Sequence, residues 1–109
     1  MNKEILQKAI NTYGEFNQMN MAIEEMSELT KAICKLRRAS NELQNTNSVY
    51  EKLKKIAVER KNIVEEMADC LITIEQLKMI FDCEGELNVE IDFKINRLKE
   101  RLENENLSK

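Results

Sequence analysis

The sequence predicts an all-α protein, and both its composition and its hydrophobic spacing lead to this expectation. Proline is absent from the 109 residues, glycine occurs only at positions 14 and 85, and Leu, Ile, Met, Glu and Lys are frequent. Such a composition favours helix over sheet. Apolar residues also recur every three or four positions along several stretches, as in helices that pack against one another. We therefore expect a single domain over residues 1–109, with four principal helices.

Two helices are expected in the N-terminal half. Lys3–Thr12 is amphipathic and is followed by Gly14, a residue suited to the C-terminal end of a helix. Phe16–Arg38 carries an apolar stripe at alternating spacings of four and three, which predicts a packing seam: Ala22, Met26, Leu29, Ile33 and Leu36. Ser40–Ser48 is polar and is expected to form a loop.

The third major helix has its own seam. Ser48 and Glu51 have the spacing of a capping box, which predicts the start of a short helix. Near residues 60–62 both a break and a continuous helix are compatible with the sequence. The following stripe repeats in heptads and should end around Asp82–Gly85: Ile63, Met67, Cys70, Ile74, Leu77 and Phe81.

The last helix and one stray isoleucine bear on assembly. Asn88–Asn104 carries an apolar stripe that consists of Ile91, Ile95, Leu98 and Leu102. The charged tail from Glu103 to Lys109 is expected to fray. Ile72 points nearly opposite the seam of the third helix, at about 100° per residue. Scattered exposed apolar residues are normal in monomers. We nevertheless expect a homodimer or homotetramer, because a monomer would leave this surface in water.

Charge and cysteine content argue against several classes of protein. The net charge is −3 with both signs interspersed, so polymeric nucleic acid is not an expected partner. Cys34, Cys70 and Cys83 occur without any histidine, which argues against a zinc site and a disulfide framework. Residues 1–10 include charged side chains and lack the apolar segment of a signal peptide or membrane anchor. We expect a cytoplasmic protein that does not bind membranes.

The most informative pattern is an acidic motif that occurs twice. Residues 24–28 (EEMSE) and 65–69 (EEMAD) both read acid, acid, Met, small residue, acid. On a helical wheel, two carboxylates of each copy lie about 60° and 120° from the predicted seam: Glu25 and Glu28 in the first copy, Glu66 and Asp69 in the second. These four should line one edge of a helix interface. Glu24 and Glu65 point farther toward solvent.

Four converging carboxylates indicate a site for a hard cation. At roughly 5 Å, each pair of carboxylates repels by about 3 kcal/mol at an effective dielectric constant near 20. A divalent cation removes this repulsion, and ligands that are all oxygen favour Mg²⁺ or Mn²⁺ over zinc. A di-iron site is disfavoured because its Glu-x-x-His elements need histidine. The ordinary alternative is a solvated acidic face, in a chain of which 34% is charged.

Glu25-x-x-Glu28 followed by Glu66-x-x-Asp69 resembles the MazG-like all-α nucleoside triphosphate pyrophosphatases, whose pattern is Glu-Glu-x-x-Glu, a spacer and Glu-x-x-Asp. The similarity covers about residues 14–102. The 37 residues between the two motifs form a longer connection than is usual in that family. The chain also has no Trp, whereas family members often hold the base with aromatic side chains. The resemblance implies a MazG-like four-helix bundle that is oligomeric.

The resemblance also implies an activity and a set of site residues. Nucleoside triphosphates would be hydrolysed to a monophosphate and pyrophosphate, as housecleaning of the nucleotide pool. Mg²⁺, or Mn²⁺ in its place, would be held by the four motif carboxylates, and Glu24 or Glu25 would orient or deprotonate the attacking water. Candidate substrate-binding residues are a glutamine and four basic side chains: Gln18, Lys31, Lys35, Lys94 and Arg97.

Two other functions are compatible with the same sequence. The heptad seams could bind partner helices in a non-catalytic interaction module, with the acidic residues serving only solubility. A family member without activity could instead bind nucleotides in a regulatory role.

Overall fold

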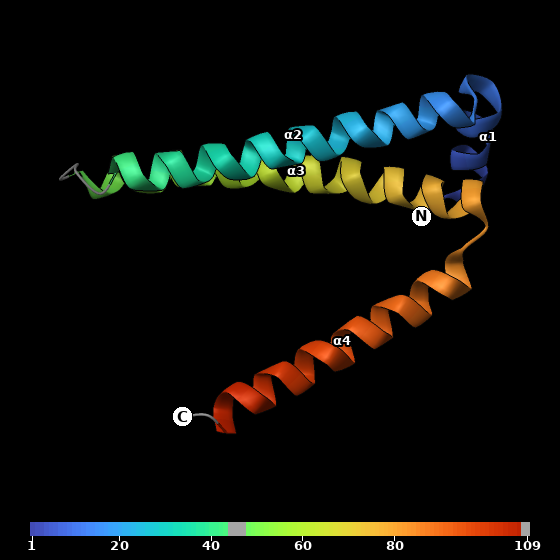
Figure 1. The fold of residues 1–109 in the computed structure, drawn as a ribbon. Coiled ribbons are helices and arrows are strands. Elements are labelled where there is room, and N and C mark those ends of the chain that lie inside the picture. The colour runs from blue at the N-terminus through green and yellow to red at the C-terminus, as the bar shows by residue number, and fades with distance from the viewer. Residues whose placement is uncertain (44–47, 108–109) are drawn as a thin grey trace.

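The chain folds into helices, two of which form a long antiparallel hairpin. The computed structural model describes residues 1–43 and 48–107, and these residues contain four helices and no strand: α1 (Lys3–Tyr13), α2 (Glu15–Leu43), α3 (Val49–Phe81) and α4 (Glu84–Leu107). α2 and α3 lie side by side, α1 packs against both at one end, and α4 diverges from the end of α3 (Figure 1). The all-α prediction is confirmed. Within the described ranges, no helix combines the length and the apolar character that a membrane span requires.

Local capping explains where the helices begin and end. Gly14 follows α1 with φ of 93°, a conformation that L side chains rarely adopt, so glycine at this position allows the turn into α2. The Ser48 side chain accepts a hydrogen bond of 3.2 Å from the amide of Glu51, which confirms the predicted N-cap of α3. Asp82 adopts the left-handed conformation and ends α3 within the predicted region.

Several predicted boundaries are wrong. α2 continues to Leu43, so the predicted loop 40–48 begins too early, and residues 44–47 of that loop lie outside the described residues. The helix continues because Ala39 packs in the hairpin, where it is only 3% exposed. Of the two alternatives near residues 60–62, the structure has the continuous helix, so the predicted short helix is the first part of α3. α4 extends to Leu107, beyond the predicted end at Asn104, and residues 108–109 of the tail that is expected to fray lie outside the described residues.

The packed face of the hairpin runs through the acidic motifs and not beside them. In α2 the least exposed side chains recur at spacings of four and three: Gln18, Ala22, Glu25, Leu29, Ala32, Leu36 and Ala39. In α3 the residues with low exposure at the same spacings are Glu59, Ile63, Glu66, Cys70, Thr73, Leu77 and Ile80, and Gln76 is buried as well. The predicted seams are therefore partly wrong: Met26, Ile33 and Met67 are 41%, 43% and 48% exposed. Alanines on the packed face of α2 let the two helices approach closely, which larger side chains would prevent.

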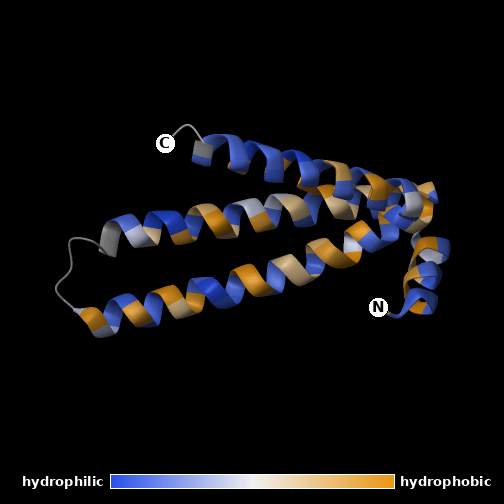
Figure 2. Cartoon of the chain, turned by 90° about the horizontal axis from the view of Figure 1, so that it is seen from below, coloured by the Kyte–Doolittle hydropathy of each residue, from blue (hydrophilic) through white to orange (hydrophobic). Residues whose placement is uncertain are grey.

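The single chain does not close the expected four-helix bundle. Side chains 88–106 of α4 are all exposed, including the predicted apolar stripe, and Figure 2 shows apolar residues along every long helix. The radius of gyration is 19.0 Å, whereas a compact chain of this length has about 13 Å. The accessible surface is 8855 Å², against roughly 6,300 Å² for a compact monomer of 12.8 kDa. About 2,600 Å² of surface is thus exposed beyond the usual amount.

Candidate metal centre

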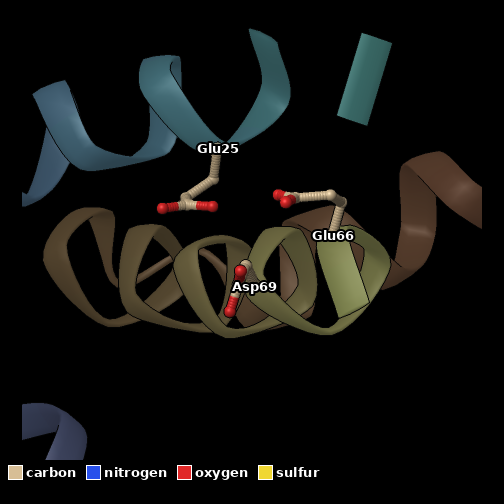
Figure 3. A group of neighbouring side chains, drawn as sticks. All are labelled: Glu25, Glu66 and Asp69. Atoms are coloured by element: carbon tan, nitrogen blue, oxygen red, sulfur yellow. The ribbon is translucent and has the colours of Figure 1, made fainter. Parts of the chain in front are cut away.

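Three carboxylates from two helices meet across the hairpin. Glu25 lies on α2, Glu66 and Asp69 lie on α3, and one oxygen of each lies within 4.8 Å of the other two. Glu66 and Asp69 share one side of α3 because they are three residues apart. Figure 3 shows the side chains of Glu25 and Glu66 extending toward one another from facing helices. Three oxygen ligands at this separation suit a hard divalent cation. We call these three residues the carboxylate triad.

Burial and mutual repulsion both disfavour the negative charge in the triad. The pKa of Glu25 is raised, mainly by burial in the hairpin and then by the negative charges of Asp69 and Glu66. The Glu66 Oε2 atom is shielded from solvent and has no hydrogen-bond partner within residues 1–43 and 48–107. An unpartnered buried carboxylate oxygen is unfavourable, and a bound cation would supply its partner. The residues present therefore fit a divalent cation.

Cys70 ties the two helices together directly behind the triad. Its thiol is buried and donates a hydrogen bond of 3.2 Å to the backbone carbonyl of Glu25. Burial, followed by the charge of Glu25, raises the pKa of the Cys70 thiol. The thiol is therefore a neutral structural donor and not a thiolate ligand.

Glu28 and Glu24 do not join the triad. The Glu28 carboxylate accepts a hydrogen bond of 3.2 Å from Lys31 and is half exposed. Glu28 is thus not among the carboxylates that converge within 4.8 Å, and its part in a metal site stays a prediction. With Glu25 at the centre of the packed face, Glu28 lies about 60° off it. Glu24 is exposed, and its charge contributes the smallest part of the raised pKa of Glu25.

Two predicted substrate-binding lysines lie near the triad. Lys31 and Lys35 line a cleft of about 190 Å³ that also includes Glu66 of the triad, together with Glu28. Both lysine side chains are mostly exposed, so their ammonium groups can reach a ligand at the mouth of the cleft.

The other predicted substrate-binding residues lie elsewhere. Gln18 is buried two turns from Glu25 and lines a separate cavity of about 570 Å³ between α1 and α2. Lys94 and Arg97 lie on the diverging α4, where the Arg97 guanidinium sits 6.0 Å from the centre of the Phe93 ring. The single chain does not bring these two basic residues to the triad.

Glu59 is a buried carboxylate that the doubled motif does not include. Only 4% of Glu59 is exposed, and its Oε1 atom lies 3.8 Å from the Lys35 ammonium. Its Oε2 atom has no hydrogen-bond partner in the described part of the chain. Glu59 precedes Glu66 by one heptad, so the two residues lie on the same side of α3. If Glu66 had been predicted to lie on the packed face, this spacing would have placed Glu59 there too.

Comparison of the chain with protein-family models, with curated proteins and with solved structures gave no match. The fold and the site by themselves define the class of the protein: an all-α protein with a helical hairpin that carries a partly buried carboxylate triad.

Proposed function

We propose that this protein is a Mg²⁺-dependent nucleoside triphosphate pyrophosphohydrolase. The observation that supports the proposal is the convergence of Glu25 from the first motif with Glu66 and Asp69 from the second. Acidic residues that serve only solubility have no reason to meet across a helix interface with a buried, unpartnered oxygen. The same residues carry the resemblance to MazG-like pyrophosphatases.

The triad and its surroundings suggest how the reaction would proceed. Glu25, Glu66 and Asp69 would hold Mg²⁺, with Mn²⁺ as a substitute. When bound, the cation supplies positive charge to phosphate oxygens and lowers the pKa of coordinated water. Glu25 lies in the triad, whereas Glu24 is exposed, so Glu25 is better placed than Glu24 to orient the attacking water or accept its proton. Lys31 would contact phosphate oxygens, and Lys35, which lies beside Glu59, would contact the substrate farther from the triad. The products would be a nucleoside monophosphate and pyrophosphate.

The uncovered apolar surface supports a homo-oligomer as the active form. The excess surface of about 2,600 Å² per chain is close to the upper end of the roughly 1,000–2,500 Å² that each partner buries in an obligate dimer. In a homodimer or homotetramer, α4 would be covered and Lys94 and Arg97 could approach a triad. Housecleaning of the nucleotide pool in the cytoplasm is the cellular role that we propose.

The activity is tested by incubating the purified protein with a panel of canonical and modified triphosphates. Pyrophosphate, and not orthophosphate, should be released, and only with Mg²⁺ or Mn²⁺. Asp69→Asn should lower kcat on the order of 100-fold or more. Glu86→Gln, which removes an exposed carboxylate on α4, serves as the matched control. Full activity in Asp69→Asn would refute the assignment of the site.

The exposed apolar stripe of α4 favours a second candidate, a non-catalytic interaction or nucleotide-binding regulatory module. Calorimetry and thermal melting separate the three cases. A scaffold should neither bind Mg²⁺ nor gain stability from Mg²⁺ with a non-hydrolysable triphosphate. A regulatory protein should gain stability without forming product, and a pyrophosphohydrolase should do both.

A further inference from the structure

A cleft continues from the triad along the hairpin, away from α1. Glu28, Lys31 and Lys35 line its α2 side, and its α3 side is formed by Glu59, Asn62 and Glu66. Glu66 belongs to both the triad and the cleft. The volume of the cleft is about 190 Å³, which is the volume of roughly six water molecules. This volume is large enough for a single heterocyclic ring, and the rest of such a ligand would extend toward the triad.

One carboxylate oxygen of Glu59 has no hydrogen-bond partner within the described residues, whereas the other forms an ion pair with Lys35. More than nine-tenths of the residue is buried, and Lys35, at 3.8 Å from Oε1, is beyond hydrogen-bond distance. Its Oε2 atom has no partner in the ranges that the structure describes. A buried carboxylate oxygen without a hydrogen-bond partner is unfavourable, and a donor on a bound ligand would compensate it.

The geometry favours an N–H donor over a cation. Within the described residues, the three carboxylates that lie within 4.8 Å of one another are those of the triad, which does not include Glu59. A cation in the cleft would therefore not find three preformed acidic ligands. Asn62, one turn from Glu59, adds an amide that both donates and accepts. Carboxylates accepting from the amino group of cytosine, and amides pairing with adenine, are established ways of reading a base edge.

The spacing along α3 is consistent with one nucleotide that reaches from the triad to Glu59. Glu59 and Glu66 are seven residues apart, which places their backbones about 10.5 Å apart along the helix axis. Phosphates at the triad and a base near Glu59 would then lie at the two ends of one groove.

We infer that Glu59, assisted by Asn62, is the specificity-determining residue of this site and accepts a hydrogen bond from the exocyclic amino group of the nucleobase. The inference rests on the proposed pyrophosphohydrolase function and names its substrate class: nucleotides whose base carries an amino group. A carbonyl at that position, as in uracil, would face the carboxylate with an acceptor and be disfavoured.

The test compares kcat/KM for dCTP and dUTP, which differ in the group at this position of the ring. The wild type should prefer dCTP by about tenfold or more. Glu59→Gln should lower this ratio at least tenfold or reverse it, because a glutamine amide can donate to the uracil carbonyl. Glu51→Gln removes an exposed carboxylate from the same helix and should leave the ratio unchanged.

A measurement on the wild-type protein covers the case in which Glu59→Gln does not fold. N4,N4-dimethyl-dCTP lacks both amino hydrogens and should be hydrolysed about tenfold less efficiently than dCTP. An unchanged dCTP to dUTP ratio in folded Glu59→Gln overturns the inference, whether or not the thermal midpoint or the oligomeric mass changes. If the wild type hydrolyses no triphosphate, the proposed function fails first; hydrolysis with equal rates for all three substrates refutes only the role of Glu59.

Discussion

Burial and two neighbouring carboxylates disfavour the negative charge of Glu25. Because burial, Asp69 and Glu66 raise its pKa, the folded state binds this proton more tightly than the unfolded state. As the pH rises above the ordinary glutamate pKa of about 4.3, the unfolded chain loses its proton first. The contribution of Glu25 to the stability of the metal-free protein is therefore present at low pH and is lost as the pH passes the raised pKa.

This pH dependence of stability leads to a prediction for Glu25→Gln. The free energy of unfolding of the wild type, minus that of the variant, should fall as the pH increases from about 4 to about 7. Urea denaturation across this range measures the difference, and saturating Mg²⁺ should remove the fall by compensating the carboxylate charge. A difference that is constant with pH would contradict the electrostatic account of the triad.

The cysteines allow the burial behind the triad to be checked. Cys34 is exposed, whereas Cys70 is buried and its thiol has a raised pKa. A thiol-specific reagent at neutral pH should therefore modify Cys34 first and Cys70 only after unfolding, because the thiolate is the reactive form. Peptide mapping by mass spectrometry identifies the order. Rapid modification of Cys70 in the native protein would mean that the hairpin is open at the triad.

The motif carboxylates show how much of the site was predictable from residues alone. Glu25, Glu66 and Asp69 were identified because the doubled motif repeats the same helical spacing. Glu28 has the same spacing but pairs with Lys31, and Glu59 belongs to neither motif. Hydrogen-bond partners and burial depend on the facing helix, about which the local spacing carries no information.

At the scale of the helices, a small ionic cluster at the end of α3 holds the start of α4. The Lys78 ammonium lies 3.0 Å from Glu75 and 3.4 Å from Glu84, the first residue of α4. Lys3 of α1 is 4.0 Å from the same Glu84. The hydrogen bond from Lys78 is the main reason that the pKa of Glu75 is lowered. Three helices thus meet at these charges.

Lys78→Met should loosen this junction. Glu75 would lose its hydrogen-bond donor and Glu84 its nearer cation, so the thermal midpoint should fall and amides in the first turns of α4 should exchange faster. Because Glu75 has a lowered pKa, the stability that it contributes in the wild type is lost as the pH falls through that pKa. Lys61→Met, on the exposed side of α3, is the control. Equal exchange in both variants would show that the cluster does not hold α4.

At the scale of the whole molecule, the open shape predicts assembly. An apolar stripe on α4 that is 44–57% exposed, in a chain with a radius of gyration of 19.0 Å, requires a covering surface. Light scattering after gel filtration should give two or four times the chain mass of 12.8 kDa. Leu98→Glu should lower that mass, whereas Lys99→Glu on the same turn should not. A wild-type monomer would contradict this prediction.

The sequence by itself determined the helical class, the caps at Gly14 and Ser48, and three of the carboxylates that meet. Only the tertiary structure decided which face of each helix is packed, that Glu28 stays outside the triad, that Glu59 is buried, and that α4 diverges from the hairpin. The physical reason is that a period near 3.6 indicates an apolar stripe but does not choose between adjacent positions. That choice depends on how closely two helices can approach, and an apolar stripe shows that a helix needs a partner without showing whether the partner belongs to the same chain.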